Sequence, residues 1–169
     1  RQEVYDYSYD GVMRSFEASF ERTGLDRFDI LFCHDVDVFT HGSREASDAR
    51  IEEFMRGGYY AMLSLRDQGV IKAWGLGVNE VEVLLEVMKT THLDCILMAG
   101  RYSLLDRSAE RELLPLCRER GTSFIIGGVF NSGILATGPV PGATFNYAEA
   151  NDDVRSRVAR MQEVAVAAG

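Results

Sequence analysis

The stretch Phe28–Asp37, which reads FDILFCHDVD, indicates both the fold class and the first candidate functional residue. Four apolar residues run without interruption from Ile30 to Cys33, and such a run is typical of a strand buried on both faces of a parallel sheet. His34 follows directly, at the end of the predicted strand, where α/β folds place their chemistry. The pattern predicts His34 as the leading functional residue, and a histidine that merely caps the strand is the alternative.

Working outward from this strand, apolar patterns and turn residues predict helices and strands in strict alternation. The expected strands cover 28–33, 70–78, 93–98 and 122–126, and the expected helices cover 7–22, 48–68, 81–89, 108–119 and 152–168. Such alternation predicts a parallel sheet with helical crossovers. Two α/β architectures fit: a doubly wound open sheet, or about half of a (β/α)8 barrel, with residues 1–169 forming a single partial domain.

One predicted helix contains an internal weak point. The pair Gly57-Gly58 lies in the middle of the helix expected over 48–68. Each glycine costs about 1 kcal/mol relative to alanine inside a helix. A break in the helix, or the close approach of another segment, is therefore expected there.

Composition excludes several classes of protein. The chain has 169 residues, 46% of them hydrophobic, and a net charge of -8, with no basic patch that would bind nucleic acid. No run approaches the ~18 apolar residues of a membrane span, and no signal peptide is visible. The isolated cysteines Cys33, Cys95 and Cys117 predict buried thiols in a reducing cytoplasm. The chain begins at Arg1 and ends at Gly169 inside helical sequence, so we expect it to be part of a longer protein.

Two aspartates follow the candidate histidine. With Asp35 and Asp37 nearby, His34 is predicted to act as a general acid or to polarise a substrate carbonyl. The alternative is that the aspartates cap the loop. No metal site is expected, because His41 and His92 lie in other segments and no cluster has ligand spacing.

Other polar residues follow the later strands. Asn79 is placed to bind an amide-bearing ligand, or to form a turn. Arg101 is a candidate to bind an anionic or hydroxylated ligand, and the alternative is that it pairs with Asp106. Tyr102 is a candidate to stack on a flat ligand, and the alternative is that it packs against the protein. The glycine-rich run 127–133 offers backbone N–H groups to phosphate, although it is neither a G-x-G-x-x-G motif nor a Walker loop.

Four motifs in order resemble one enzyme family. The segments Ile30–Asp35, Gly75–Glu80, Ala99–Leu105 and Asn131–Leu135 resemble the fourth to seventh strands, with the loops after them, of aldo-keto reductases. The wording of the motifs is most similar to the bacterial sugar 1-dehydrogenases that act on L-fucose, L-galactose or D-threo-aldoses, and to pyridoxal 4-dehydrogenase. The resemblance covers nearly the whole chain and implies a (β/α)8 barrel, of which strands four to seven are present.

The resemblance also implies a chemistry. It implies NAD or NADP as cofactor, a small sugar or aldehyde as substrate, and hydride transfer at a carbonyl or hemiacetal carbon. His34 then orients the substrate oxygen, with Arg101 and Tyr102 as candidate substrate-binding residues. Asn79 and the loop residues that would wrap the cofactor are the candidate cofactor-binding residues: Asn79, Phe130, Asn131, Ser132 and Gly133.

Departures from the family pattern limit what carries over. The acid–base tyrosine, lysine and aspartate belong to earlier strands, and the tyrosines at 5, 7 and 9 do not match that motif, so this chain alone is expected to be inactive. The family's strand-six glutamine falls at Ala99, its nicotinamide-stacking aromatic at Gly127, and its serine–asparagine pair at Gly77-Val78. The expected activity of the parent is oxidation of an aldose to a lactone, with pyridoxal oxidation or a non-catalytic nicotinamide-binding subunit as alternatives.

Overall fold

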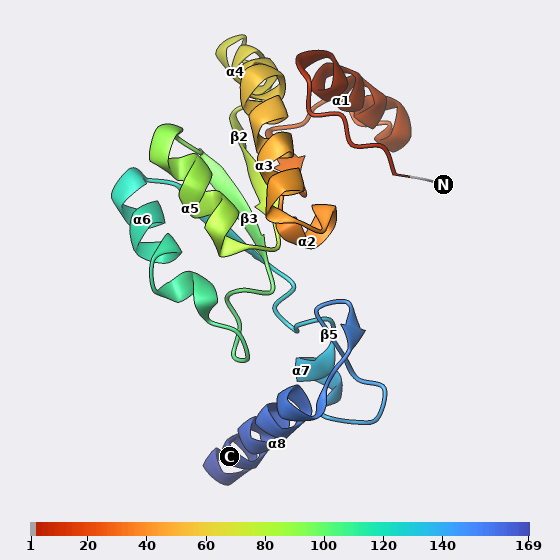
Figure 1. Cartoon of the computed structure of the whole chain (residues 1–169), viewed down its shortest axis with the longest axis vertical. Helices are drawn as coiled ribbons and strands as arrows, with labels where there is room; N and C mark the ends of the chain where they lie inside the picture. The colour runs from red at the N-terminus through yellow and green to blue at the C-terminus, as the bar shows by residue number, and fades with distance from the viewer. Residues whose placement is uncertain (1–2) are drawn as a thin grey trace.

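A parallel sheet of four strands organises the molecule, which is described over residues 3–169 in this computed structural model (Figure 1). The strands are β1 (Ile30–His34), β2 (Ala73–Val78), β3 (Cys95–Ala99) and β4 (Ser123–Gly127), and they lie in the order β1-β2-β3-β4. A doubly wound sheet reverses its strand order at a switch point, and this one does not. The sequential order is that of a barrel wall, so the prediction of a partial (β/α)8 barrel is confirmed and the doubly wound alternative is wrong.

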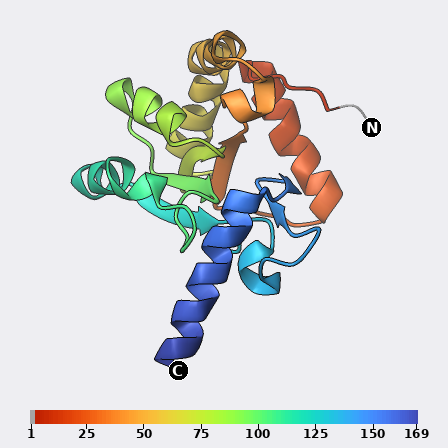
Figure 2. The same ribbon diagram turned by 60° about the horizontal axis from the view of Figure 1, so that its bottom comes forward.

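One face of the sheet is buried beneath helices. The connecting helices α4 (Tyr59–Asp67), α5 (Val81–Thr90) and α6 (Leu113–Arg120) lie along this face (Figures 1 and 2). Side chains of alternating strand residues point into this layer, because successive side chains of a strand face opposite sides. Those with almost no exposed surface include Trp74, Leu76, Ile96 and Met98. On the opposite face, Ile30 and Ile125 remain exposed, so the expectation of a strand buried on both faces is wrong for β1.

The first helix packs against the predicted weak point. Helix α1 (Tyr9–Thr23) begins at Ser8, whose side chain accepts a hydrogen bond from the Gly11 N–H. In place of one helix over 48–68, the structure has α3 (Arg44–Glu53), a π-helical segment (Phe54–Gly58) and α4. The Gly58 N–H donates to the Tyr7 carbonyl over 3.0 Å, and a Cβ on Gly58 would lie 2.6 Å from that oxygen. The predicted break and close approach are therefore both confirmed.

The C-terminal segment lies beyond the carboxyl ends of the strands. Figure 2 shows helix α8 (Asp152–Ala168) extending away from the sheet. No helix or strand was expected between residues 126 and 152, but the structure has a short helix α7 (Ile134–Thr137) and a hairpin of β5 (Thr144–Phe145) and β6 (Ala148–Glu149). Helix α8 packs through Val154 and Val158 in a small apolar cluster of its own, whose other buried members are Leu105, Ile134, Ala143 and Ala150. This segment is therefore anchored separately from the main core.

Two short helices complete the described part of the chain: α2 (Val38–His41) and a 3-10 turn (Ser108–Glu110). The predicted helix over 108–119 thus restarts at Leu113, two residues before Pro115. The three cysteines are free and buried, as predicted. Within residues 3–169, we find no helix with the length and apolar character needed to cross a bilayer.

Candidate functional site

The carboxyl ends of the strands form a common rim. The register pairs His34 of β1 with Gly77 of β2, and Gly77 with Leu97 of β3, so their positions share one face of the sheet. Asn79 follows β2 directly, and Gly100 follows β3. The rim therefore brings together residues that are distant in the sequence, because parallel strands need a long crossover connection.

His34, Asp35 and Asn79 form one side of the site, which we call the strand-end wall. The Asn79 Nδ2 donates to Asp35 Oδ1 over 3.3 Å, and His34 Nδ1 lies 3.2 Å from Asp35 Oδ2. The backbone N–H of Asn79 donates to Asp37 Oδ2 over 2.6 Å. Asp37 is buried and its Oδ1 also accepts from the Thr40 N–H at the start of α2, so the capping interpretation is correct for Asp37.

The side chains of Tyr7 and His41 contact the backbone of the turn that follows β1. The Tyr7 hydroxyl lies 2.9 Å from the His34 carbonyl oxygen and 2.7 Å from the Asp35 carbonyl oxygen. The His41 Nε2 lies 2.9 Å from the same Asp35 oxygen. Asp35 has a φ of 55°, which is unfavourable for an L-residue, and these contacts stabilise it. No functional role was assigned to Tyr7 from the sequence, because it does not match the acid–base motif, yet its hydroxyl contacts the His34 carbonyl oxygen.

Burial changes the electrostatics of this wall. Desolvation raises the pKa of the Asp35 carboxyl above its usual value, and the neighbouring His34 charge opposes that shift in part. Burial also raises the pKa of the Tyr7 hydroxyl far above its usual value, so this group stays protonated and acts as a donor. The His34 side chain itself is 72% exposed and opens into a hollow. A Cβ on Gly77 would lie only 3.3 Å from His34 Cδ2, so glycine leaves room for the imidazole.

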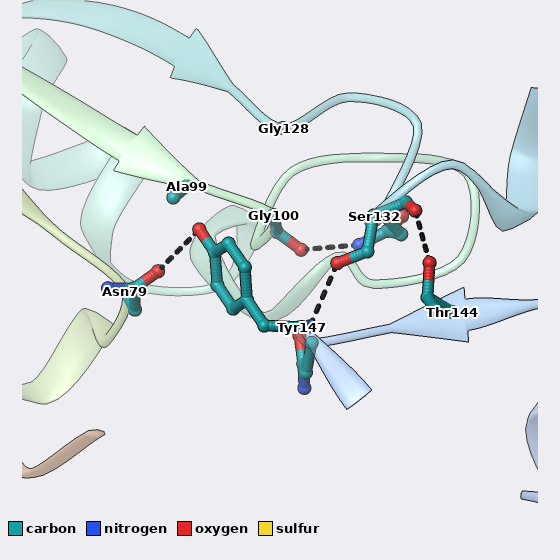
Figure 3. Close-up of a pocket in the computed structure, with 9 residues that line it drawn as sticks. Asn79, Ala99, Gly100, Gly128, Ser132, Thr144 and Tyr147 are labelled. Atoms are coloured by element: carbon teal, nitrogen blue, oxygen red, sulfur yellow. Dashed lines mark hydrogen bonds between the residues drawn. The ribbon is translucent and has the colours of Figure 1, made fainter. Parts of the chain in front are cut away.

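Asn146 and Tyr147, at the tip of the β5–β6 hairpin, form the other side of the site, which we call the hairpin wall. The Tyr147 hydroxyl donates to Asn79 Oδ1 over 3.2 Å, and the Tyr147 N–H donates to Ser132 Oγ over 2.9 Å (Figure 3). The Thr144 hydroxyl donates to the Ser132 carbonyl over 2.6 Å. The hairpin is therefore tied both to the loop after β4 and to the strand-end wall.

Arg101 joins the two walls. Its Nε donates to the Asn79 carbonyl over 2.7 Å, and its Nη1 donates to Asn146 Oδ1 over 2.9 Å. A weaker contact of 3.4 Å reaches Asp106, the pairing considered from the sequence. The guanidinium thus positions both walls, and it is not among the residues that line the hollows.

Two hollows meet at the rim. The larger, about 410 Å³, is floored by Ala99, Gly100 and Gly128, and its other lining residues are Asn79, Asn131, Ser132, Thr144, Asn146 and Tyr147. The smaller, about 300 Å³, is lined by His34, Asp35, Phe39, Gly77, Val78, Asn79, Leu97, Ala99 and Tyr147. Asn79, Ala99 and Tyr147 border both hollows, so a ligand in one lies next to a ligand in the other.

The loop after β4 contributes some of its expected residues to the larger hollow. Asn131 is buried, donates from Nδ2 to the Gly100 carbonyl over 2.9 Å, and lines the hollow with Ser132. Phe130 is 58% exposed and Gly133 precedes α7, and neither lines the hollow. Tyr102 packs edge-on against Phe124, with ring centroids 6.1 Å apart, and borders a separate hollow on another part of the surface.

The floor of the larger hollow suits a flat ligand. Its floor consists of small residues, so a flat group can approach the backbone closely. Gly128 has a φ of 60°, which L side chains rarely adopt, and a Cβ there would lie 3.2 Å from the Gly100 nitrogen, so a side chain would be strained and tightly packed. The Asn79 amide and the Ser132 hydroxyl supply hydrogen-bonding groups around this floor. These residues fit a nicotinamide cofactor.

The strand ends thus place a hollow that contains a histidine beside a hollow with a floor of small residues. The model of the aldo/keto reductase family matches residues 1–168, and the chain belongs to that family. This class of enzyme uses nicotinamide cofactors.

Relatives and solved structures agree with that assignment. The chain is 44% identical over 164 residues to pyridoxal 4-dehydrogenase of Microbacterium luteolum, covering 96% of this chain and 47% of the relative. It is 33% identical over 161 residues to D-threo-aldose 1-dehydrogenase of a Pseudomonas species, and this match covers 95% of this chain and 46% of the relative. An aldo-keto reductase of Bacillus halodurans in its holo form superposes with a TM-score of 0.63 at 27% sequence identity. This superposition covers 82% of this chain and 41% of the other. The chain therefore spans about half the length of the curated relatives it matches.

Proposed function

We propose that the full-length protein is an NAD(P)-dependent dehydrogenase that oxidises the hemiacetal carbon of an aldose to a lactone. The observation that carries this proposal is the shared border of the two hollows. The His34 imidazole opens into one, and the glycine floor forms the other, with Asn79 and Tyr147 between them. A substrate carbon held beside His34 therefore lies next to the place proposed for the nicotinamide.

Each residue has a distinct task in this proposal. His34 holds the reacting oxygen, and Asp35 Oδ2, 3.2 Å from Nδ1, orients the imidazole. Asn79, Asn131 and Ser132 bind the cofactor, which supplies the hydride acceptor when bound. The proton of the hemiacetal hydroxyl passes to the acid–base tyrosine that the family resemblance implies on the earlier strands of the full-length protein. Phe130, Gly133 and Tyr102 line neither hollow, so we assign them no contact with either ligand.

A second candidate substrate is pyridoxal. The relative at 44% identity is a pyridoxal 4-dehydrogenase. Pyridoxal closes on its own hydroxymethyl group into a cyclic hemiacetal, so its oxidation is the same reaction at the same kind of carbon as aldose oxidation. One site with one set of roles thus accounts for both candidates.

The test is a substrate survey with the full-length protein. L-fucose, L-galactose, D-arabinose and pyridoxal are each supplied with NAD or NADP, and the formation of reduced nicotinamide is followed. We expect saturable rates with at least one of these hemiacetals. A rate that does not respond to the concentration of any of them, with either cofactor, would overturn the proposal and favour a non-catalytic role.

A further inference from the structure

Two aromatic rings from distant segments meet over the His34 hollow. Phe39 lies on α2 and Tyr147 at the tip of the hairpin, and their ring centroids are 5.6 Å apart with an interplanar angle of 48°. Phe39 is 47% exposed and Tyr147 is 71% exposed. Both line the hollow that contains His34. Large apolar surfaces exposed beside a polar site commonly mark ligand-binding surface.

The lining of this hollow combines two kinds of chemistry. His34, Asp35 and Asn79 offer polar groups, whereas Phe39, Leu97 and Tyr147 offer apolar surface. A cyclic hemiacetal has the same division, with oxygen atoms on its edge and carbon on its ring faces. A ring whose oxygen contacts His34 can therefore place a face against the aromatic pair.

The backbone at Tyr147 supports a specific use of that ring. Asn146 and Tyr147 have φ values of 49° and 64° in the two-residue turn between β5 and β6. Turns with positive φ at both central residues favour Asn-Gly, and a bulky residue at the second position costs about 1 kcal/mol or more. The bonds to Ser132 and Asn79 offset this cost and aim the ring across the border of the hollows (Figure 3).

We propose that Phe39 and Tyr147 form an aromatic wall that binds one face of the cyclic hemiacetal beside His34, and that Tyr147 is a specificity-determining residue. This inference rests on the proposed dehydrogenase function. The backbone bond of Tyr147 to Ser132 and the packing on Phe39 hold the wall in place, and the ring provides the contact. The wall selects cyclic over open-chain aldehydes, because only a ring presents a continuous apolar face to it.

The test uses Phe39→Ala, Tyr147→Ala and Tyr147→Phe in the full-length protein. Calorimetry measures the binding of the lactone product, with reduced cofactor present, and steady-state kinetics gives KM and kcat. We expect each alanine variant to weaken lactone binding and raise KM about three- to tenfold, as the loss of one aromatic contact does. Tyr147→Phe keeps the ring and should stay within about twofold. Phe39→Ala should leave the cofactor Kd unchanged, because Phe39 does not line the larger hollow.

Controls separate this wall from the function on which it rests. Tyr60→Ala removes an exposed tyrosine of α4 outside both hollows and should change neither KM nor lactone binding. Because Phe39 and Tyr147 act together, the double alanine variant should lose less affinity than the product of the two single losses. If the unaltered protein oxidises hemiacetals but both alanine variants keep its KM and lactone affinity, the aromatic wall is wrong and the dehydrogenase stands. If the unaltered protein neither oxidises nor binds them, the proposed function fails, and the wall with it.

Discussion

The strand-end wall and the hairpin wall reach the same site by different physical means. His34, Asp35 and Asn79 extend from a parallel sheet that is packed against helices on one face, and the buried Asp37 carboxylate holds the backbone of Asn79. Asn146 and Tyr147 stand on a hairpin of two-residue strands, which is held by side-chain hydrogen bonds to its neighbours. The first wall shares the stability of the core, whereas the second depends on a few local bonds. This difference suits a fixed catalytic group on one side and an adjustable ligand contact on the other.

The largest expected effect tests whether the strand-end wall carries the chemistry. In the full-length protein, His34→Ala should lower kcat by about a hundredfold or more, because a positioned acid–base or polarising group contributes that much. The cofactor Kd should change little, since His34 does not line the larger hollow. The exposed His92, which lies outside both hollows, is the matched control. An unchanged kcat in His34→Ala would remove this residue from the mechanism.

The next effect breaks the link between the walls. Arg101→Met removes charged hydrogen bonds to Asn79 and Asn146, which are partly buried, and should lower the free energy of unfolding by about 1.5–3 kcal/mol. Arg101→Lys keeps the charge but not the fork of donors, so it should recover part of that loss. Urea denaturation of the full-length protein measures both. Arg107→Met, which breaks an exposed pair with Glu110, should cost far less, and equal losses at positions 101 and 107 would contradict the linking role.

A smaller effect sharpens the boundary at Asn79, which belongs to both hollows. Asn79→Ala removes the side-chain bonds to Asp35 and Tyr147 but keeps the backbone bond to Asp37. We expect the Kd for reduced cofactor, measured by nicotinamide fluorescence, to rise about tenfold. Tyr147→Phe loses one of the same bonds and should change this Kd less. A Kd that is unaltered in Asn79→Ala would place the cofactor elsewhere.

The smallest effect concerns the carboxyl of Asp35. Because desolvation raises its pKa, the ionised form is disfavoured in the fold, and the protein loses stability as the pH rises from the ordinary carboxyl pKa to the raised one. Asp35→Asn has no such loss. The Tm of the variant minus that of the unaltered protein should therefore be more positive at about pH 7.5 than at about pH 4. The exposed Asp26→Asn is the control, and a difference that is the same at both pH values would show that burial of Asp35 has no cost.

Part of the fold was predictable because apolar runs mark buried strands. The four strands were placed within three residues of their observed starts, and His34 and Asn79 were found because polar residues that follow such strands lie at the rim. Tyr102 was placed less well. The chain turns at Gly100, which has a φ of 68°, and the tyrosine two residues later packs on Phe124. That change of direction leaves no periodic signal in the sequence.

The residues that sequence reasoning missed depend on contacts over long distances. Tyr7 lies 27 residues from the His34 carbonyl that it contacts, and Tyr147 lies 68 residues from Asn79. Neither belongs to an apolar run or a recognisable motif. A signal for Tyr147 did exist in the Asn146-Tyr147 pair, because asparagine favours the first position of a tight hairpin turn.

The amino-acid sequence by itself determined the alternation of helices and strands, the family and the histidine at the end of β1, because these follow from local hydrophobic patterns and short motifs. Only the tertiary structure decided which groups face one another. The β5–β6 hairpin reaches the strand ends, where Arg101 bonds to both Asn79 and Asn146. Tyr147 borders both hollows. The physical reason is that hydrogen bonds and ring contacts between distant segments depend on how the whole chain packs, whereas the hydrophobic pattern of a helix or strand depends only on its own residues.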